Sequence, residues 1–138
     1  MNRTAALLVA LSLLAVSFSD RVSAHHSFAM FDSSKTVSIE GTVKEFAWKN
    51  PHVILWVATP AKDGKPEGLW SIETTSPGNL TRAGWTRRTF NPGDRVKVEA
   101  RPLRNGETGG QYVRATLTDT GKVVEGGSQR EYAKPEAK

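Results

Sequence analysis

Histidines are the side chains in this sequence whose type and position could do chemistry. His25 and His26 follow a stretch that ends at Ala24, and the third histidine, His52, stands directly after Pro51. If a signal peptidase cuts after Ala24, His25 becomes the first residue of the mature chain. Its free amine and an imidazole nitrogen can then chelate one metal ion. We therefore hypothesise a site made by His25, His26 and His52, suited to Cu(II) or another divalent metal.

Further ligands and a plainer interpretation of the histidines stay open at this point. Asp32 or Glu45 could add oxygen ligands, and the site would resemble the histidine brace of exported copper proteins. Alternatively, the first two histidines lie on a frayed terminus, and His52 bonds a backbone group beside Pro51. The spacing of distant histidines has no ligand signature of its own, so the pattern does not choose between the two.

Tryptophans suggest a second kind of site. Trp56 and Trp70 fall on two neighbouring predicted strands, where they could form a stacking surface for a ligand such as a sugar ring, with Trp48 and Trp85 near its ends. Core packing explains large rings in a small domain equally well. The sequence thus predicts Trp56 and Trp70 as candidate ligand-binding residues.

The formal net charge is +5, and a run of basic residues could form an anion-attracting stripe. A solvated charged surface is the ordinary alternative. The residues are Arg82, Arg87, Arg88, Arg95, Lys97, Arg101, Arg104 and Arg114.

Several kinds of chemistry are excluded by what the sequence lacks. It contains no cysteine, which excludes disulfides, thiolate metal sites and thiol catalysis. It has no serine elbow, no phosphate loop and no recognisable carboxylate pair. We therefore expect no enzyme activity and no obligatory cofactor.

Alternation of apolar and polar residues predicts the elements that would hold these side chains. In residues 36–48 the apolar phase slips after Val43, which indicates a β-bulge at Lys44 or Glu45. Ser76 and Pro77 predict a short helix that ends at Gly84. Strands are expected over residues 36–48, 52–59, 69–75, 95–101 and 112–118, with Val43, Val53, Leu55, Ile72, Val96, Val98, Val113 and Leu117 inside.

The order of these elements is typical of an OB-fold. Three strands, a short helix and two further strands predict an all-β protein, a small five-stranded barrel with the helix between strands 3 and 4. The predicted domains are a signal peptide at residues 1–24, an N-terminal extension at 25–35, the OB-like barrel at 36–120 and a disordered tail at 121–138. The apolar run in the signal is too short for a comfortable membrane span, and no later segment is apolar enough for one.

Four groups of residues carry a resemblance to a known family. They are HHSFAMFD at 25–32, Gly41-Thr42-Val43, WKNPH at 48–52 and Pro92-Gly93-Asp94. Together they resemble a family of uncharacterised exported proteobacterial proteins over roughly residues 24 to 120. More loosely, the chain is similar to bacterial periplasmic OB-fold proteins linked to stress and ligand binding. Neither resemblance implies a definite activity.

These observations favour an exported protein of the periplasm or the secreted fraction. The first hypothesis is a binding or interaction module whose partner is a small molecule, a glycan or an envelope protein, and not nucleic acid. The alternative is a copper or other divalent metal binding protein that uses a mature N-terminal histidine. A structural component of the envelope is the third possibility.

Overall fold

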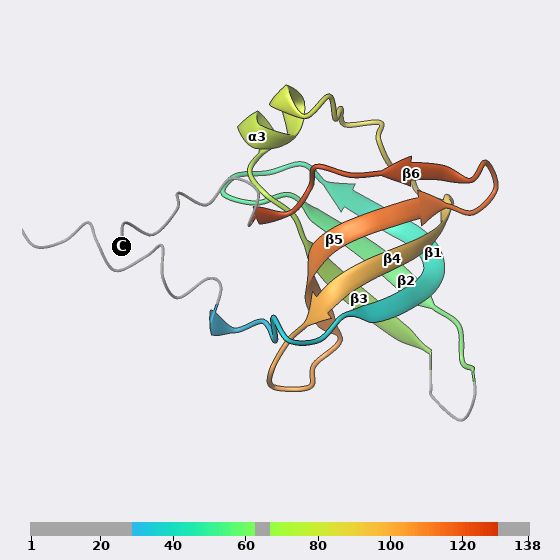
Figure 1. The fold of residues 1–138 in the computed structure, drawn as a ribbon. Helices are drawn as coiled ribbons and strands as arrows, with labels where there is room; N and C mark the ends of the chain where they lie inside the picture. The colour runs from blue at the N-terminus through green and yellow to red at the C-terminus, as the bar shows by residue number, and fades with distance from the viewer. Residues whose placement is uncertain (1–28, 63–66, 130–138) are drawn as a thin grey trace, which may run out of the picture. The chain divides into compact units, whose positions relative to one another are not determined.

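The computed structural model describes residues 29–62 and 67–129, and the residues from Phe31 onward form one compact unit. Six strands and one short helix make up this part of the chain (Figure 1). In chain order they are β1 (Val37–Ala47), β2 (Ile54–Thr59), β3 (Gly68–Glu73), α3 (Pro77–Arg82), β4 (Arg95–Pro102), β5 (Gly109–Leu117) and β6 (Lys122–Val124).

The first five strands close into a mixed barrel, which confirms the predicted fold class. The sheet order is β3-β2-β1-β4-β5-β6, and a parallel pairing of β3 with β5 closes the ring. All other neighbouring strands pair antiparallel. The single described helix lies between β3 and β4, as expected, because Ser76 caps it and Pro77 opens it.

The bulge predicted in β1 is confirmed. Val43 pairs with Val57 of β2, and the next pair joins Glu45 to Trp56, so Lys44 is the extra residue. Gly41 lies where the strand passes from β4 to β2, and a Cβ there would sit 2.1 Å from the carbonyl oxygen of Ala58. Only glycine allows this close approach, which lets one strand serve both sides of the barrel.

A second bulge, in β5, corrects the expected inward set. Glu99 pairs with Arg114 and Ala100 pairs with Tyr112, so Val113 is the extra residue. The bulge reverses the side-chain phase, because an inserted residue moves the following ones to the other face. Tyr112 is therefore fully buried and Val113 only half-buried, whereas Leu117, which pairs with the buried Val96, packs against the core as expected and is half-buried. The other six predicted core residues are all buried.

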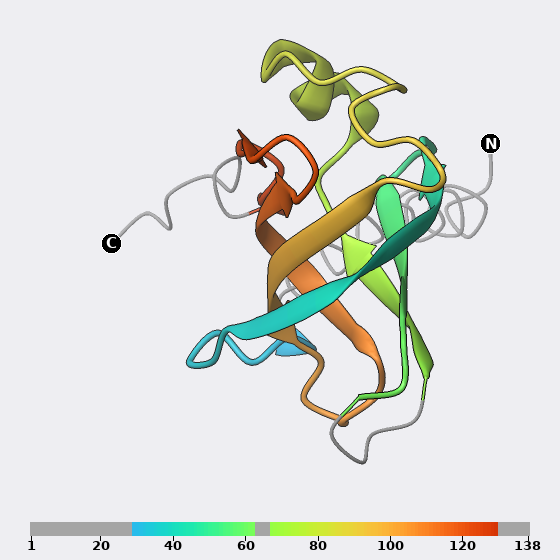
Figure 2. The same cartoon turned by 90° about the vertical axis from the view of Figure 1, so that its right-hand side faces the viewer.

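The helix α3 lies at one end of the barrel (Figures 1 and 2), and aromatic rings pack together there. Trp85 contacts Phe90 and Tyr112 edge to face, with ring centroids 5.6 and 5.3 Å apart. Phe46 packs against Phe90 at 5.4 Å and reaches Trp48 at 5.6 Å. Large rings from β1, β5 and the segment after α3 thus close this end, which we call the α3 end.

The expectation of a disordered tail from residue 121 was wrong for its first part. Lys122–Val124 forms β6 on the edge of β5, and residues 127–129 are buried. Three hydrogen bonds hold this C-terminal segment: Trp85 donates to the carbonyl of Glu125 at 2.7 Å, Tyr112 to that of Val124 at 2.7 Å, and the Thr75 amide to that of Gly127 at 3.1 Å. Few of its residues are apolar, but its backbone satisfies buried donors of the barrel. Residues 130–138 lie outside the described residues.

The chain before β1 is also tied to the barrel. Phe31 is only 3% exposed and forms an isolated bridge with Leu103, and the Asp32 amide donates to the carbonyl of Pro102 at 2.8 Å. The predicted signal peptide and residues 25–28 of the extension lie outside the described residues. In the part of the chain that is described, no helix is long and apolar enough to cross a membrane.

Candidate site around His52

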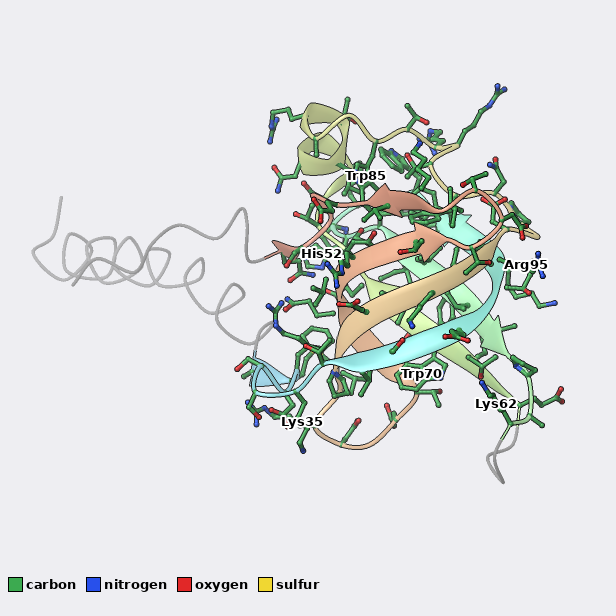
Figure 3. The ribbon with its side chains drawn as sticks, turned by 45° about the vertical axis from the view of Figure 1, so that its right-hand side comes forward. Lys35, His52, Lys62, Trp70, Trp85 and Arg95 are labelled. Carbon is green, nitrogen blue, oxygen red and sulfur yellow. The ribbon has the colours of Figure 1, made fainter. Side chains whose placement is uncertain are left out.

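His52 lies in the loop between β1 and β2, at the α3 end of the barrel (Figure 3). The loop is pinned next to it, because the Val53 amide donates to the carbonyl of Thr75 at 3.1 Å. In return, the amide and the hydroxyl of Thr74 donate to the carbonyl of Val53 at 2.9 and 2.7 Å. His52 is thereby carried on a rigid junction between β2 and the end of β3.

The ring of His52 is held by a carboxylate. Its Nδ1 lies 2.7 Å from Oε1 of Glu73, and the side chains are 32% and 22% exposed. A carboxylate only accepts hydrogen bonds, so Nδ1 carries the hydrogen and Nε2 of the neutral ring keeps its lone pair. This arrangement leaves Nε2 as the nitrogen that can bind a ligand.

Glu73 is held in turn by the C-terminal segment. Nε2 of Gln129 donates to the same Oε1 of Glu73 and to the carbonyl of Thr74, the latter at 3.0 Å. Gln129 is 5% exposed. The carboxylate is therefore fixed from both sides, by His52 and by Gln129.

A buried amide lies across the barrel closure from Glu73. Gln111 of β5 pairs with Glu73 of β3 in register, and it is 1% exposed. Its Oε1 accepts a long hydrogen bond of 3.4 Å from Arg101, while its Nε2 has no hydrogen-bond partner among the described residues. A buried donor without a partner costs about 1–3 kcal/mol, so the polar surroundings of Glu73 hold an unsatisfied group.

The expected oxygen ligands do not join His52. Ser34 and Lys35 bind the Asp32 carboxylate, and their hydrogen bonds lower its pKa to about 2. Glu45 lies on β1 opposite Trp56. In residues 29–62 and 67–129, no three His, Cys, Asp or Glu side chains gather as a metal site. His25 and His26 lie outside the described residues.

Trp56 and Trp70 lie on opposite faces of the β2–β3 pair. Trp70 is paired with Val57, whose side chain is fully buried, and it packs against the core. Trp56 is paired with Ser71 on the other face, because successive side chains in a strand point to opposite sides. The two indoles therefore do not form the single stacking surface that the sequence suggested.

The predicted basic stripe divides into two groups. On the strands and their hairpins, Arg95 pairs with Asp119, Lys97 with Glu40 at 3.5 Å, and Arg114 with Glu99 at 2.9 Å. Hydrogen bonds to these carboxylates raise the pKa of Arg95 and of Arg114. The arginines around α3 have no such partner in the structure's described residues.

The sequence pattern indicated His52 as a candidate, but it did not indicate the residues that hold its ring. In the sequence, Glu73 looks like an ordinary polar residue on the outer face of a strand. Gln129 lies in a stretch with few apolar residues, which is typical of a disordered tail. His52 comes just before β2 and Glu73 ends β3, so the pairing of these two strands brings them together. The sequence could have indicated this contact only if the strand register had been known. Gln129 gave no signal in the sequence.

Comparison with known proteins identifies a family but no activity. Residues 13–113, most of the chain, match the family described as a family of unknown function, DUF6152. No curated protein and no solved structure matches the chain. The matched segment includes His25, His26, His52 and Glu73, and it ends within β5. The chain therefore belongs to DUF6152, a family of unknown function.

Proposed function

We propose that this chain is an exported binding module whose ligand is a divalent metal ion, Cu(II) foremost, and that His52 is the ligand supplied by the barrel. The observation that carries the proposal is the 2.7 Å contact between Nδ1 of His52 and Glu73. Histidines that bind metals almost always donate their other ring N–H to a carboxylate, a carbonyl or water. Glu73 would orient the ring and hold the hydrogen on Nδ1, so that Nε2 faces the metal with its lone pair.

The mature N-terminus supplies the remaining nitrogen ligands in this proposal. If cleavage follows Ala24, His25 offers an amine and an imidazole, and His26 a second imidazole.

The choice of Cu(II) follows from the ligand types. Imidazole and amine nitrogens suit Cu(II), which also binds most tightly of the divalent first-row metals, and the sequence has no thiolate to favour another metal.

Calorimetric titration of natively processed protein with Cu(II) tests the proposal. Loss of a residue that only orients a metal ligand typically weakens metal binding about 10- to 100-fold. His52→Ala removes a ligand itself, so it should weaken binding at least about tenfold. One extra residue ahead of His25 should also weaken binding, because it removes the terminal amine from the chelate. Equal affinity for the native, extended and His52→Ala proteins would overturn the proposal.

The role of Glu73 has a matched control in Glu99, a half-buried carboxylate that pairs with Arg114 and lies on β4. Glu73→Gln should lower Cu(II) affinity about 10- to 100-fold, because the ring of His52 loses its orienting acceptor. Glu99→Gln should leave the affinity unchanged. If the two variants bind alike, the contact between His52 and Glu73 has no part in metal binding.

A further inference from the structure

Some cations of the described residues pair with carboxylates and others do not; Lys44 of β1, Lys62 and Lys122 of β6 form no ion pair, and neither do the cations at the α3 end. Four cations of the described chain pair with carboxylates, and they lie on the strands, their hairpins or the segment before β1: Lys35, Arg95, Lys97 and Arg114. Four exposed cations at the α3 end have no carboxylate partner among the described residues: Lys49, Arg82, Arg87 and Arg88. We call these four residues the cationic end.

The cationic end is built on anchored structure. The guanidinium of Arg87 lies 5.9 Å from the ring centroid of Trp48 and donates a long hydrogen bond of 3.4 Å to the Trp48 carbonyl. Trp48 contacts Phe46, which packs on the buried Phe90. Arg82 is held by Asn79 at 2.6 Å. These contacts hold two positive groups in place at the surface, which lowers the entropy lost on binding a partner.

No acid interrupts this positive surface along the chain. The segment from Thr74 to Gly93 contains three arginines and no aspartate or glutamate. The acids that flank it are engaged elsewhere: Glu73 binds His52 and Gln129, and Asp94 accepts the Asn91 amide at 2.8 Å. Neither carboxylate forms an ion pair with any of the four cations.

The spread of the cations indicates the shape of the partner. Arg82, Arg87 and Arg88 follow one another along the segment that runs from α3 to the start of β4 (Figures 1 and 2), and Lys49 lies in the loop between β1 and β2, next to the Trp48 that Arg87 contacts. A chain with repeated negative charges can meet such a stripe along its length, whereas a single small anion would meet only one or two cations.

A bilayer is disfavoured by the absence of an apolar anchor at the stripe. The exposed large hydrophobic residues among those described are Met30, Leu69 and Val123, and none belongs to the segment from α3 to β4 or to the loop of Lys49. Membrane-surface binding normally combines basic residues with apolar side chains that insert. The signal-like N-terminus favours an extracytoplasmic polymer over nucleic acid.

We propose that the cationic end binds an extended anionic polysaccharide, recognised through its sulfate, phosphate or carboxylate groups. This interaction is independent of the metal site, because it uses neither His52 nor the chain terminus. Heparin, a sulfated polysaccharide, serves as the probe.

The experiment measures heparin binding of the whole mature protein at several salt concentrations, with EDTA present. The wild type should bind at low salt and be released as salt rises, since exposed charge contacts are screened. The double variant Arg87→Gln/Arg88→Gln should bind roughly tenfold more weakly, on the order of two exposed charge contacts. Arg95→Gln/Arg114→Gln removes the same charge from paired positions and should change affinity less than about twofold.

Three results would overturn the inference: no binding of heparin, equal losses in the two double variants, or tighter binding to phosphatidylglycerol vesicles or single-stranded DNA than to heparin. Circular dichroism checks that each variant is folded. If the first pair fails to fold, Lys49→Gln/Arg82→Gln takes its place with the same expected loss. His52→Ala should bind heparin as the wild type does, which separates this test from that of the metal site.

Discussion

The two ends of the barrel are closed in different ways. At the α3 end, rings from three separate segments pack around Trp85, and the C-terminal segment is bound over them by Trp85 and Tyr112. At the opposite end, the exposed hairpin after β4 meets the chain before β1 through one bridge between Phe31 and Leu103. There Trp70 is only half-buried (Figure 3).

This difference matters because His52 belongs to the rigid end. Its carboxylate partner, Glu73, is held by Gln129, and the segment of Gln129 is held by the aromatic cluster. A side chain held in this way would lose little freedom if it bound a ligand, as we propose for His52. The opposite end offers exposed loops without such support.

The largest expected difference between the ends is in stability. Trp85→Ala should lower the free energy of unfolding by about 3–5 kcal/mol, because the ring is 4% exposed and three aromatic neighbours would line the cavity. Trp70→Ala should cost about 1–3 kcal/mol, since half-burial gives a smaller transfer free energy. Urea unfolding of both variants measures this, and equal costs would break the comparison.

A glycine variant tests the closure by the C-terminal segment. A Cβ on Gly127 would lie 2.7 Å from the Trp85 ring and 2.9 Å from Tyr112, so Gly127→Ala should cost about 1–3 kcal/mol of unfolding free energy. Gly78 in α3 is the control, because its Cβ would meet only the end of Arg82 at 3.9 Å. Gly78→Ala should change stability by less than about 0.5 kcal/mol. Thermal unfolding of both decides; a neutral Gly127→Ala would mean that the segment is not packed this way.

The smallest expected effect concerns stability at acidic pH at the barrel end where Phe31 and Asp32 lie. Hydrogen bonds from Ser34, then Lys35, lower the pKa of Asp32 to about 2 from 3.8. A carboxyl whose pKa is lowered by folding contributes stability above its unfolded pKa, and that contribution is lost as the pH falls through about 2. An NMR titration should place the Asp32 midpoint near 2, and in Ser34→Ala it should move towards 3.8. A wild-type midpoint near 3.8 would mean that the hydrogen bonds from Ser34 and Lys35 to Asp32 do not form in solution.

The two bulges show which register shifts the alternation of apolar residues can predict and which it cannot. In β1 the slip from Val43 to Phe46 and Trp48 was visible, because apolar residues changed phase in the sequence. In β5 the residues Val113, Ala115 and Leu117 keep an unbroken alternation, so nothing marked Val113 as the extra residue. Tyr112 turned inward because the partner strand β4 set the register, and a partner strand is a tertiary constraint.

The candidate site shows the same limit. The residue types in the sequence sufficed to select His52, and Ser76, Pro77 and Gly84 sufficed to place a short helix. They did not suffice to find Glu73, or to separate Trp56 from Trp70 before the β2–β3 register was known. The division of the arginines into paired and unpaired groups likewise depends on which acid lies across the strand.

By itself, the sequence determined the order of the first five strands and the helix, the bulge in β1 and most of the core, because hydrophobic periodicity and capping act over a few neighbouring residues. The tertiary structure alone decided that Tyr112 is buried, that residues 121–129 are ordered in large part and that Glu73 holds His52. These features join residues far apart in the chain. Their free energy comes from packing and from satisfying buried polar groups, and no local pattern encodes which distant partner will do so.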